Sequence, residues 1–179
     1  MSRKSIGSGA RAWWHGLQPP PIGQGVGDRG AIARLRRSST ILDALSEQAT
    51  HRLLRMVKAD DYDTRPVVTA AMVLASVRKD DPDITVARRL GLGGEKRIIS
   101  PLRFKRLVAA TDPDDALSQF RRLVRMLDNR VNVFDLADSV YDWTDAVRGA
   151  QRRYRWMLDF HGALEAAEAG DADAEEQVA

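Results

Sequence analysis

The stretch SPLRFKRLVAATDPDDALSQFRRLVRML, residues 100–127, carries the start signals of two helices. Ser100 can cap the first helix, and Pro101 suits its first position, where the missing N–H costs nothing. Asp112 and Pro113 repeat this arrangement for the second helix. Apolar residues recur at helical spacing after Pro113, and arginines lie beside them. The stretch therefore predicts two adjacent helices, each with a core side and an arginine side.

Composition indicates a globular chain without thiol chemistry. The 179 residues, 44% of them hydrophobic, suffice to bury a core. No apolar run approaches the roughly 20 residues that span a membrane, and no apolar segment of a signal peptide follows Arg3 and Lys4. The chain has no cysteine, which excludes disulfides, zinc–thiolate sites and cysteine nucleophiles. We therefore expect a cytoplasmic protein.

Charge is distributed unevenly along the chain. The net charge is +3, but all 28 Lys and Arg precede Glu165, and six acids lie in the last fifteen residues. The first 164 residues thus hold 28 basic and 19 acidic residues, a net charge of +9. Of the basic residues, 23 are arginines, whose planar fork suits phosphate, although a GC-rich genome also favours arginine. The segregation of charge is the stronger indication of an anionic partner.

Apolar residues at helical spacing recur along most of the chain, and no stretch alternates long enough to predict a strand. The sequence predicts an all-α protein, a bundle of about seven or eight helices in two small lobes. Besides the pair in residues 100–127, the expected helical segments are residues 10–17, 29–37, 40–58, 64–77, 86–90, 133–143 and 145–162.

Glycine and proline divide the chain further. The loop Gly91–Gly94 is the expected boundary between lobes at residues 10–91 and 95–163. Residues 18–27 hold three prolines and three glycines and form a loop. Residues 1–9 and the acidic residues 164–179 are expected to be disordered.

No pattern in the sequence supports catalysis. The three histidines lie far apart, and serine and threonine lack the motifs of activated nucleophiles. One helix-spaced stripe of acids could bind a divalent metal if a second acidic helix faced it; alternatively it is a solvated face or pairs with a basic patch. The stripe consists of Asp135, Asp138, Asp142 and Asp145. We expect no catalytic residue, no metal and no cofactor.

Three segments place clustered arginines next to an apolar stripe: residues 29–37, 103–125 and 148–155. One such helix is usually a solvated face, but three in a +9 body favour nucleic-acid binding. No helix is typical of base readout and no aromatic ladder is present, so we expect sequence-independent backbone contacts. The alternative is a helical protein–protein module whose arginine faces meet acidic partners.

The same segments carry a family resemblance. Its motifs are RAW at residues 11–13, GAIARLRR at 30–37, SPLRFKRLV at 100–108, QFRRLV at 119–124, VFDLADSVYDW at 133–143 and RYRW at 153–156, followed by Phe160. In this order and spacing the chain resembles the CasB family, the small subunit of type I-E CRISPR Cascade complexes, over residues 10–162. The loop at residues 18–27 and the acidic tail depart from the family pattern.

The resemblance implies a non-catalytic helical scaffold in antiviral defence. Two copies lie head to tail with each other, and their partners are the Cascade backbone and large subunits. The two copies stabilise the R-loop formed by crRNA, target DNA and the displaced non-target strand. The guide supplies the sequence specificity, and the acid stripe becomes a possible subunit contact. The implied nucleic-acid contacts, together with Arg125 beside them, are Arg36, Arg37, Arg103, Arg106, Arg121, Arg122, Arg125, Arg152 and Arg153. Which arginine contacts which strand stays open.

Overall fold

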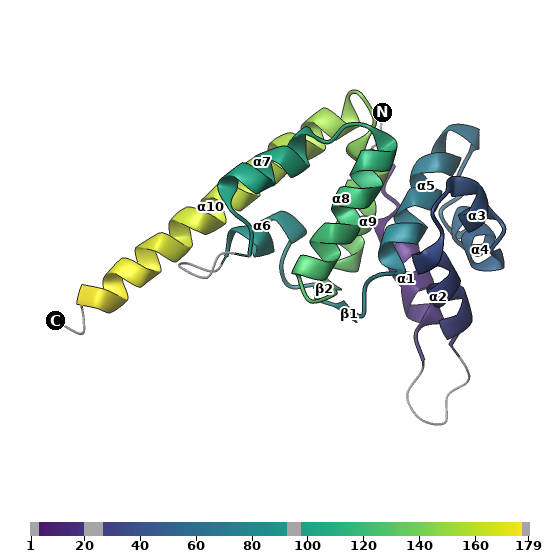
Figure 1. Ribbon diagram of the computed structural model, residues 1–179, viewed down its shortest axis with the longest axis horizontal. Coiled ribbons are helices and arrows are strands. Elements are labelled where there is room, and N and C mark those ends of the chain that lie inside the picture. The colour runs from purple at the N-terminus through teal and green to yellow at the C-terminus, as the bar shows by residue number, and fades with distance from the viewer. Residues whose placement is uncertain (1–3, 20–26, 93–97, 177–179) are drawn as a thin grey trace.

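The computed structural model describes residues 4–19, 27–92 and 98–176, and within them the chain is almost entirely helical (Figure 1). Ten helices and two short strands lie in these ranges: α1 (Gly7–Leu17), α2 (Arg29–Arg37), α3 (Ile41–Leu45), α4 (Gln48–Met56), α5 (Asp61–Leu74), β1 (Lys79–Asp80), α6 (Val86–Gly91), α7 (Pro101–Ala109), α8 (Pro113–Met126), β2 (Arg130–Val131), α9 (Val133–Trp143) and α10 (Arg148–Glu176). The predicted all-α class is confirmed. The strands, which pair in parallel, are too short to show an alternating pattern.

Helices α5 and α9 form the centre of the molecule. Residues 67–74 of α5 are all buried, as expected of a helix that is apolar on every side. Helix α9 contacts α1 and α5 on one side and α10 on the other. An aromatic cluster of stacked and T-shaped rings then joins α7, α8, α9 and α10, and its members are Phe104, Phe120, Trp143, Trp156 and Phe160.

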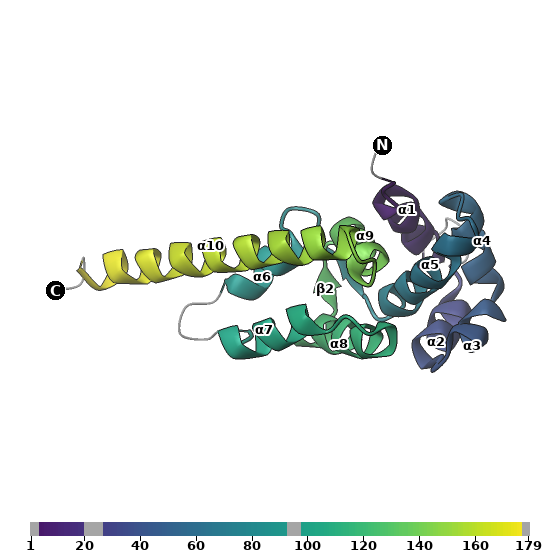
Figure 2. The same ribbon diagram turned by 90° about the horizontal axis from the view of Figure 1, so that it is seen from above.

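The helices before and after the predicted lobe boundary share this core. Figures 1 and 2 show α1–α5 at one end of the molecule and α6, α7 and α10 at the other, with α8 and α9 between them. Gly91 ends α6 and contacts α10 so closely that a Cβ there would lie 2.3 Å from the Phe160 carbonyl oxygen. Gly91 is therefore a packing residue and not the start of a linker. Gly93 and Gly94 lie outside the described residues.

Side-chain caps determine where most helices begin. Asp28, Ser100, Asp112 and Asn132 each accept hydrogen bonds from first-turn N–H groups, as predicted. The cap of α10 is Asp145 and not Thr144, because its carboxylate accepts from the amides of residues 147 and 148 at 3.0 and 2.7 Å. The helix expected over residues 40–58 is two helices, α3 and α4, separated at residues 46 and 47.

Of the two ends expected to be disordered, residues 4–9 and 164–176 have a described backbone, and residues 1–3 and 177–179 lie outside the described residues. Lys4 pairs with Asp63, the Ser5 hydroxyl donates to Asp138 at 2.8 Å, and Ile6 is buried. Polar contacts to distant residues thus hold residues 4–7, and hydrophobic spacing cannot reveal such contacts. At the other end, α10 continues to Glu176, beyond the end predicted near Gly162.

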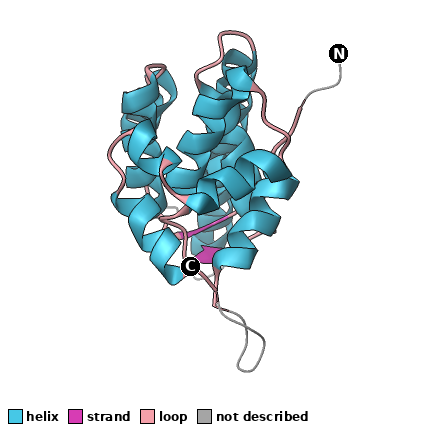
Figure 3. Ribbon diagram, turned by 90° about the vertical axis from the view of Figure 1, so that its right-hand side faces the viewer, coloured by secondary structure: helices cyan, strands magenta, loops and turns pink. Residues whose placement is uncertain are grey.

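The strand pair connects the segment after α5 to the segment after α8. Lys79 pairs with Arg130, and Asp80 pairs with Val131; Figure 3 shows both strands in magenta among the helices. Among the described residues, no helix has the length and hydropathy needed to cross a membrane.

Candidate nucleic-acid interface

Helices α7 and α8 place three of the predicted arginines around one groove. Ser100 caps α7, and Phe104 faces the core, so Arg103 and Arg106 remain exposed on the outer side. Arg122 is the exposed arginine of α8 that faces them. All three line a groove of about 570 Å³ between the two helices. The structure therefore brings Arg122 of α8 together with Arg103 and Arg106 of α7.

The described lining of the groove carries positive charge and no acidic side chain. Within the described part of the chain, no carboxylate lines the groove, and no ion pair involves Arg103, Arg106 or Arg122. Several arginines elsewhere are paired, whereas others, such as Arg36 and Arg37, are exposed without a described ion pair; the paired ones include Arg34 with Glu47, Arg52 with Asp28, Arg89 and Arg130 with Asp81, and Arg148 with Asp145. The groove thus gathers three guanidinium groups that form no ion pair with the described residues.

The floor of the groove is apolar, and none of its residues belongs to the predicted site. Leu107 and Leu123 are buried, and Met126 and Ile98 are half-buried. Gln119 adds the one neutral polar side chain of the described lining. Gln119 and Met126 precede and follow Arg122 by three and four residues, so helical spacing could have placed them on its face.

Three further predicted arginines are exposed but lie outside this groove. Arg36 and Arg37 occupy the last turn of α2, and Arg125 occupies the last turn of α8. A cation in the last turn is favoured by the helix dipole, so their position also has a structural reason. Their guanidinium groups remain accessible to an anion.

Arg121 has a different environment from its neighbour Arg122. It is half-buried, and its Nη2 donates hydrogen bonds to the carbonyls of Leu35 at 3.2 Å and Ser38 at 2.9 Å. Burial, with a smaller contribution from the charge of Arg125, lowers the pKa of Arg121. Those two carbonyls lie at the C-terminus of α2, where helical partners run out. Arg121 thus caps α2 from α8.

Arg152 and Arg153 connect α10 to α9. Arg152 is 7% exposed, and its guanidinium lies 2.8 Å from the carboxylate of Asp142, 3.6 Å from Asp135 and 3.9 Å from Asp138. Arg153 donates to the carbonyl of Trp143 at 2.6 Å. Neither side chain lines the α7–α8 groove.

Asp138 and Asp142 of the aspartate stripe are buried, and Asp135 and Asp145 are half-buried. Asp138 accepts hydrogen bonds from the amides of Ile6 and Gly7, both at 2.8 Å, at the start of α1. Asp135 accepts from the amide of Val86 at 2.8 Å, at the start of α6. These contacts, together with the ion pairs of Arg152, show that the stripe is not a solvated face. The alternative, that the stripe pairs with a basic group, holds, and that group is Arg152 of the same chain. The stripe positions helix N-termini.

Asp145, the fourth member of the stripe, and Asp63 are also held by hydrogen bonds. Bonding from the Arg148 amide keeps the pKa of Asp145 below its usual range. Burial acts to raise the pKa of Asp63, but hydrogen bonds from Lys4 and Tyr141 outweigh it and lower the value. Burial, followed by the bond to Asp63, raises the pKa of Tyr141 to about 12. These groups tie α5 and α9 to the N-terminal segment and α10.

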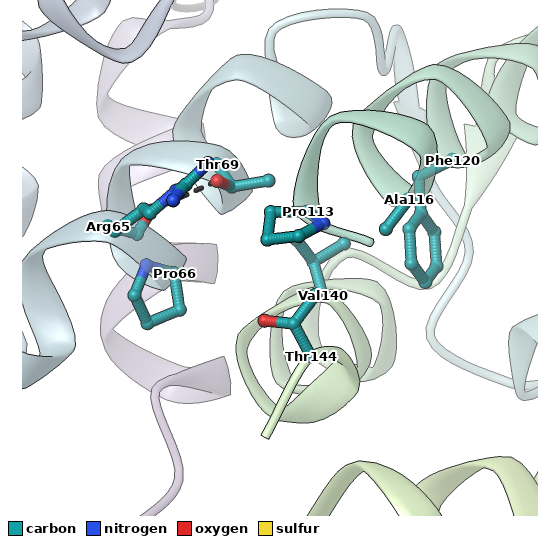
Figure 4. Close-up of a pocket in the computed structure, with 8 residues that line it drawn as sticks. All are labelled: Arg65, Pro66, Thr69, Pro113, Ala116, Phe120, Val140 and Thr144. Atoms are coloured by element: carbon teal, nitrogen blue, oxygen red, sulfur yellow. Dashed lines mark hydrogen bonds between the residues drawn. The ribbon is translucent and has the colours of Figure 1, made fainter. Parts of the chain in front are cut away.

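A second, small cavity lies where α5, α8 and α9 meet (Figure 4). Its volume is about 40 Å³, and its walls include Pro66, Pro113 and Val140. The hydroxyl of Thr69 is occupied in a bond to the Arg65 carbonyl at 3.0 Å. In the described residues, no group of three or more His, Asp or Glu side chains is arranged to hold a metal ion. The α7–α8 groove is therefore the stronger candidate.

Comparison with known proteins identifies one matching family. The model of the family described as CRISPR-associated protein Cse2 matches residues 31–161, which is 131 of the 179 residues. Neither the curated proteins nor the solved structures yield a significant match. The matched region begins in α2 and ends within α10, so it contains α7, α8 and the groove.

Proposed function

Because the chain belongs to the Cse2 family, the small subunit of type I-E CRISPR Cascade, we propose that it binds nucleic-acid backbone and stabilises the R-loop. In this role it supports the crRNA–target DNA heteroduplex and the displaced strand without catalysing a reaction. The observation that carries the proposal is the α7–α8 groove, where Arg103, Arg106 and Arg122 converge without a carboxylate among the described lining.

The chemistry of these groups fits backbone binding. A guanidinium presents a planar fork of donors that matches two phosphate oxygens, and it stays charged at any physiological pH. Phosphate contacts hold a strand in place without reading its sequence. This is the requirement for a subunit of a complex in which the guide RNA recognises the target by base pairing.

Assembly extends this proposal. We expect a second copy to lie head to tail with the first, between the Cascade backbone and large subunits in the cytoplasm. Arg36, Arg37 and Arg125 are exposed on α2 and α8 and are available for further phosphate contacts. They could extend the basic surface beyond the groove.

The test compares two triple variants of equal charge in the assembled complex. One replaces Arg103, Arg106 and Arg122 with alanine. The control replaces Arg55, Arg78 and Arg88, which are exposed and lie outside the groove. Target-DNA affinity is measured over a salt series. The groove variant should weaken binding, and its log–log salt slope should fall by about one for each lost contact, about three in all.

Equal losses in the two variants would contradict the proposal, because net charge alone would then explain binding. Thermal melting of both variants checks that the fold is retained. If the groove variant instead kept DNA affinity and lost binding to an acidic protein partner, the protein–protein alternative would replace the proposal.

A further inference from the structure

The α7–α8 groove has a feature that phosphate binding does not require. Backbone contacts need arginines on an open surface, whereas here the arginines surround a hollow with an apolar floor. Leu107 and Leu123 form its buried base, and Met126 borders it. Its volume of about 570 Å³ lies within the range of about 300–1,000 Å³ typical of small-molecule pockets.

The hollow shape and apolar floor of the groove suit a nucleotide with its base better than a sugar–phosphate backbone alone. A base offers an apolar face to the floor and a π surface on which a guanidinium can stack. Its phosphates are anionic, and Arg103, Arg106 and Arg122 form no ion pair with the described residues. In a duplex the base faces are stacked and hidden, so only a single strand can supply this ligand.

We propose that the α7–α8 groove binds one unstacked base of single-stranded DNA, with the three arginines on its flanking phosphates. The inference rests on the proposed function and adds the form of the ligand. The choice of DNA follows from the lining, where Gln119 is the one neutral polar side chain and already donates to Asp115 at 3.2 Å. Apart from the remaining amide groups of Gln119, the described lining offers a ribose 2′-hydroxyl no neutral polar side chain.

The first experiment removes the bases and keeps the charge. Fluorescence anisotropy of the full chain at low ionic strength compares an oligothymidylate of about 12 nucleotides with an abasic spacer of the same phosphate number. The base-bearing strand should bind about 2- to 30-fold more tightly, the effect of about 0.5–2 kcal/mol for one guanidinium on a π face. The salt slopes should agree. Equal affinity for the two strands, or no measurable binding of the oligothymidylate, would overturn the proposal.

The second experiment alters the groove floor and leaves its arginines in place. Met126→Asn should reduce the preference for the base-bearing strand and leave affinity for the spacer unchanged. Met157→Asn is the matched control, because Met157 is also half-buried against the core but lies outside the groove. An equal loss of preference in both variants, or none in either, would count against a base on this floor.

Two further comparisons separate this inference from the proposed function. If the triple arginine variant binds both strands more weakly while the parent protein binds them equally, the result supports backbone binding and contradicts the base site. If the triple arginine variant leaves the affinity for both strands unchanged, the function proposed for the groove is wrong. Tighter binding of oligouridylate than of oligothymidylate would overturn the choice of DNA.

Discussion

Arg121 and Arg122 show how much the environment of one residue matters. They are adjacent in α8, and about 100° of helical rotation separates them. Arg121 faces the C-terminus of α2 and caps the carbonyls of Leu35 and Ser38, whereas Arg122 faces the groove. The same side chain therefore stabilises the fold at one position and remains available for a ligand at the next.

Substituting each arginine separately tests this difference. Arg121→Ala should lower the free energy of unfolding by about 1–3 kcal/mol, because it leaves two buried or half-buried carbonyls without their donor. Arg122→Ala should change it by less than about 0.5 kcal/mol, as usual for an exposed position. Urea denaturation of the full chain measures both. Equal stability of the two variants would show that Arg121 does not act as a cap.

At the scale of elements, α9 organises its neighbours through its aspartates. Asp138 receives the N-terminus of α1, Asp135 receives that of α6, and Asp142 holds Arg152 of α10. A carboxylate at a helix N-terminus satisfies amides that lack helical partners and complements the dipole. One helix thus fixes the direction of three others.

Arg152→Ala should strongly destabilise the junction of α9 and α10. Removing one partner of a buried ion pair typically costs about 3–5 kcal/mol, since the opposing charges stay buried. Chemical denaturation measures the loss. The exposed Arg155→Ala on the same helix is the control and should be nearly neutral. A folded, fully stable Arg152→Ala variant with weakened DNA binding would favour the phosphate contact that the sequence predicts.

Local signals in the sequence predict individual elements well. The bounds of α2 and the starts of α7, α8 and α9 follow from caps that act within one turn. The separation of α3 from α4 depends on the Ser46 hydroxyl, which bonds to the Asp43 carbonyl, and on Thr50, which bonds to the Ala44 carbonyl. Periodicity cannot distinguish such a break from a continuous helix, because apolar residues recur on both sides of it.

The candidate site could be predicted one helix at a time. The spacing of Arg103 and Arg106 shows that they share a face of α7, but their position opposite Arg122 depends on how α7 and α8 pack. Tertiary contacts likewise separate Arg121 and Arg152 from the exposed arginines. Their partners, Leu35 and Asp142 among them, lie far away or on another helix, and a one-dimensional pattern does not identify them.

At the scale of the whole molecule, the described buried residues of α10 end where its acidic segment begins. Ala163 is the last residue of this helix described as buried, and the family match ends at residue 161. Beyond it, the helix runs past α6 and α7 in Figures 1 and 2. Residues 164–179 contain six acids and no Lys or Arg, so they reduce the net charge from +9 to +3. This distribution gives a basic body with an acidic extension.

Truncation after Ala163 should therefore change DNA association more than stability. Removing six negative charges strengthens the positive field of the body, and we expect about three- to tenfold faster association with nonspecific DNA at low salt. The gain should shrink above about 0.1 M salt, where charges more than about 10 Å apart are screened. Stopped-flow fluorescence measures the rates, and a full-length variant with the six acids changed to Gln or Asn separates charge from length. Association that is unchanged in both variants would mean that the extension does not reduce the field at the groove; an unchanged melting temperature would show that the core ends with Ala163.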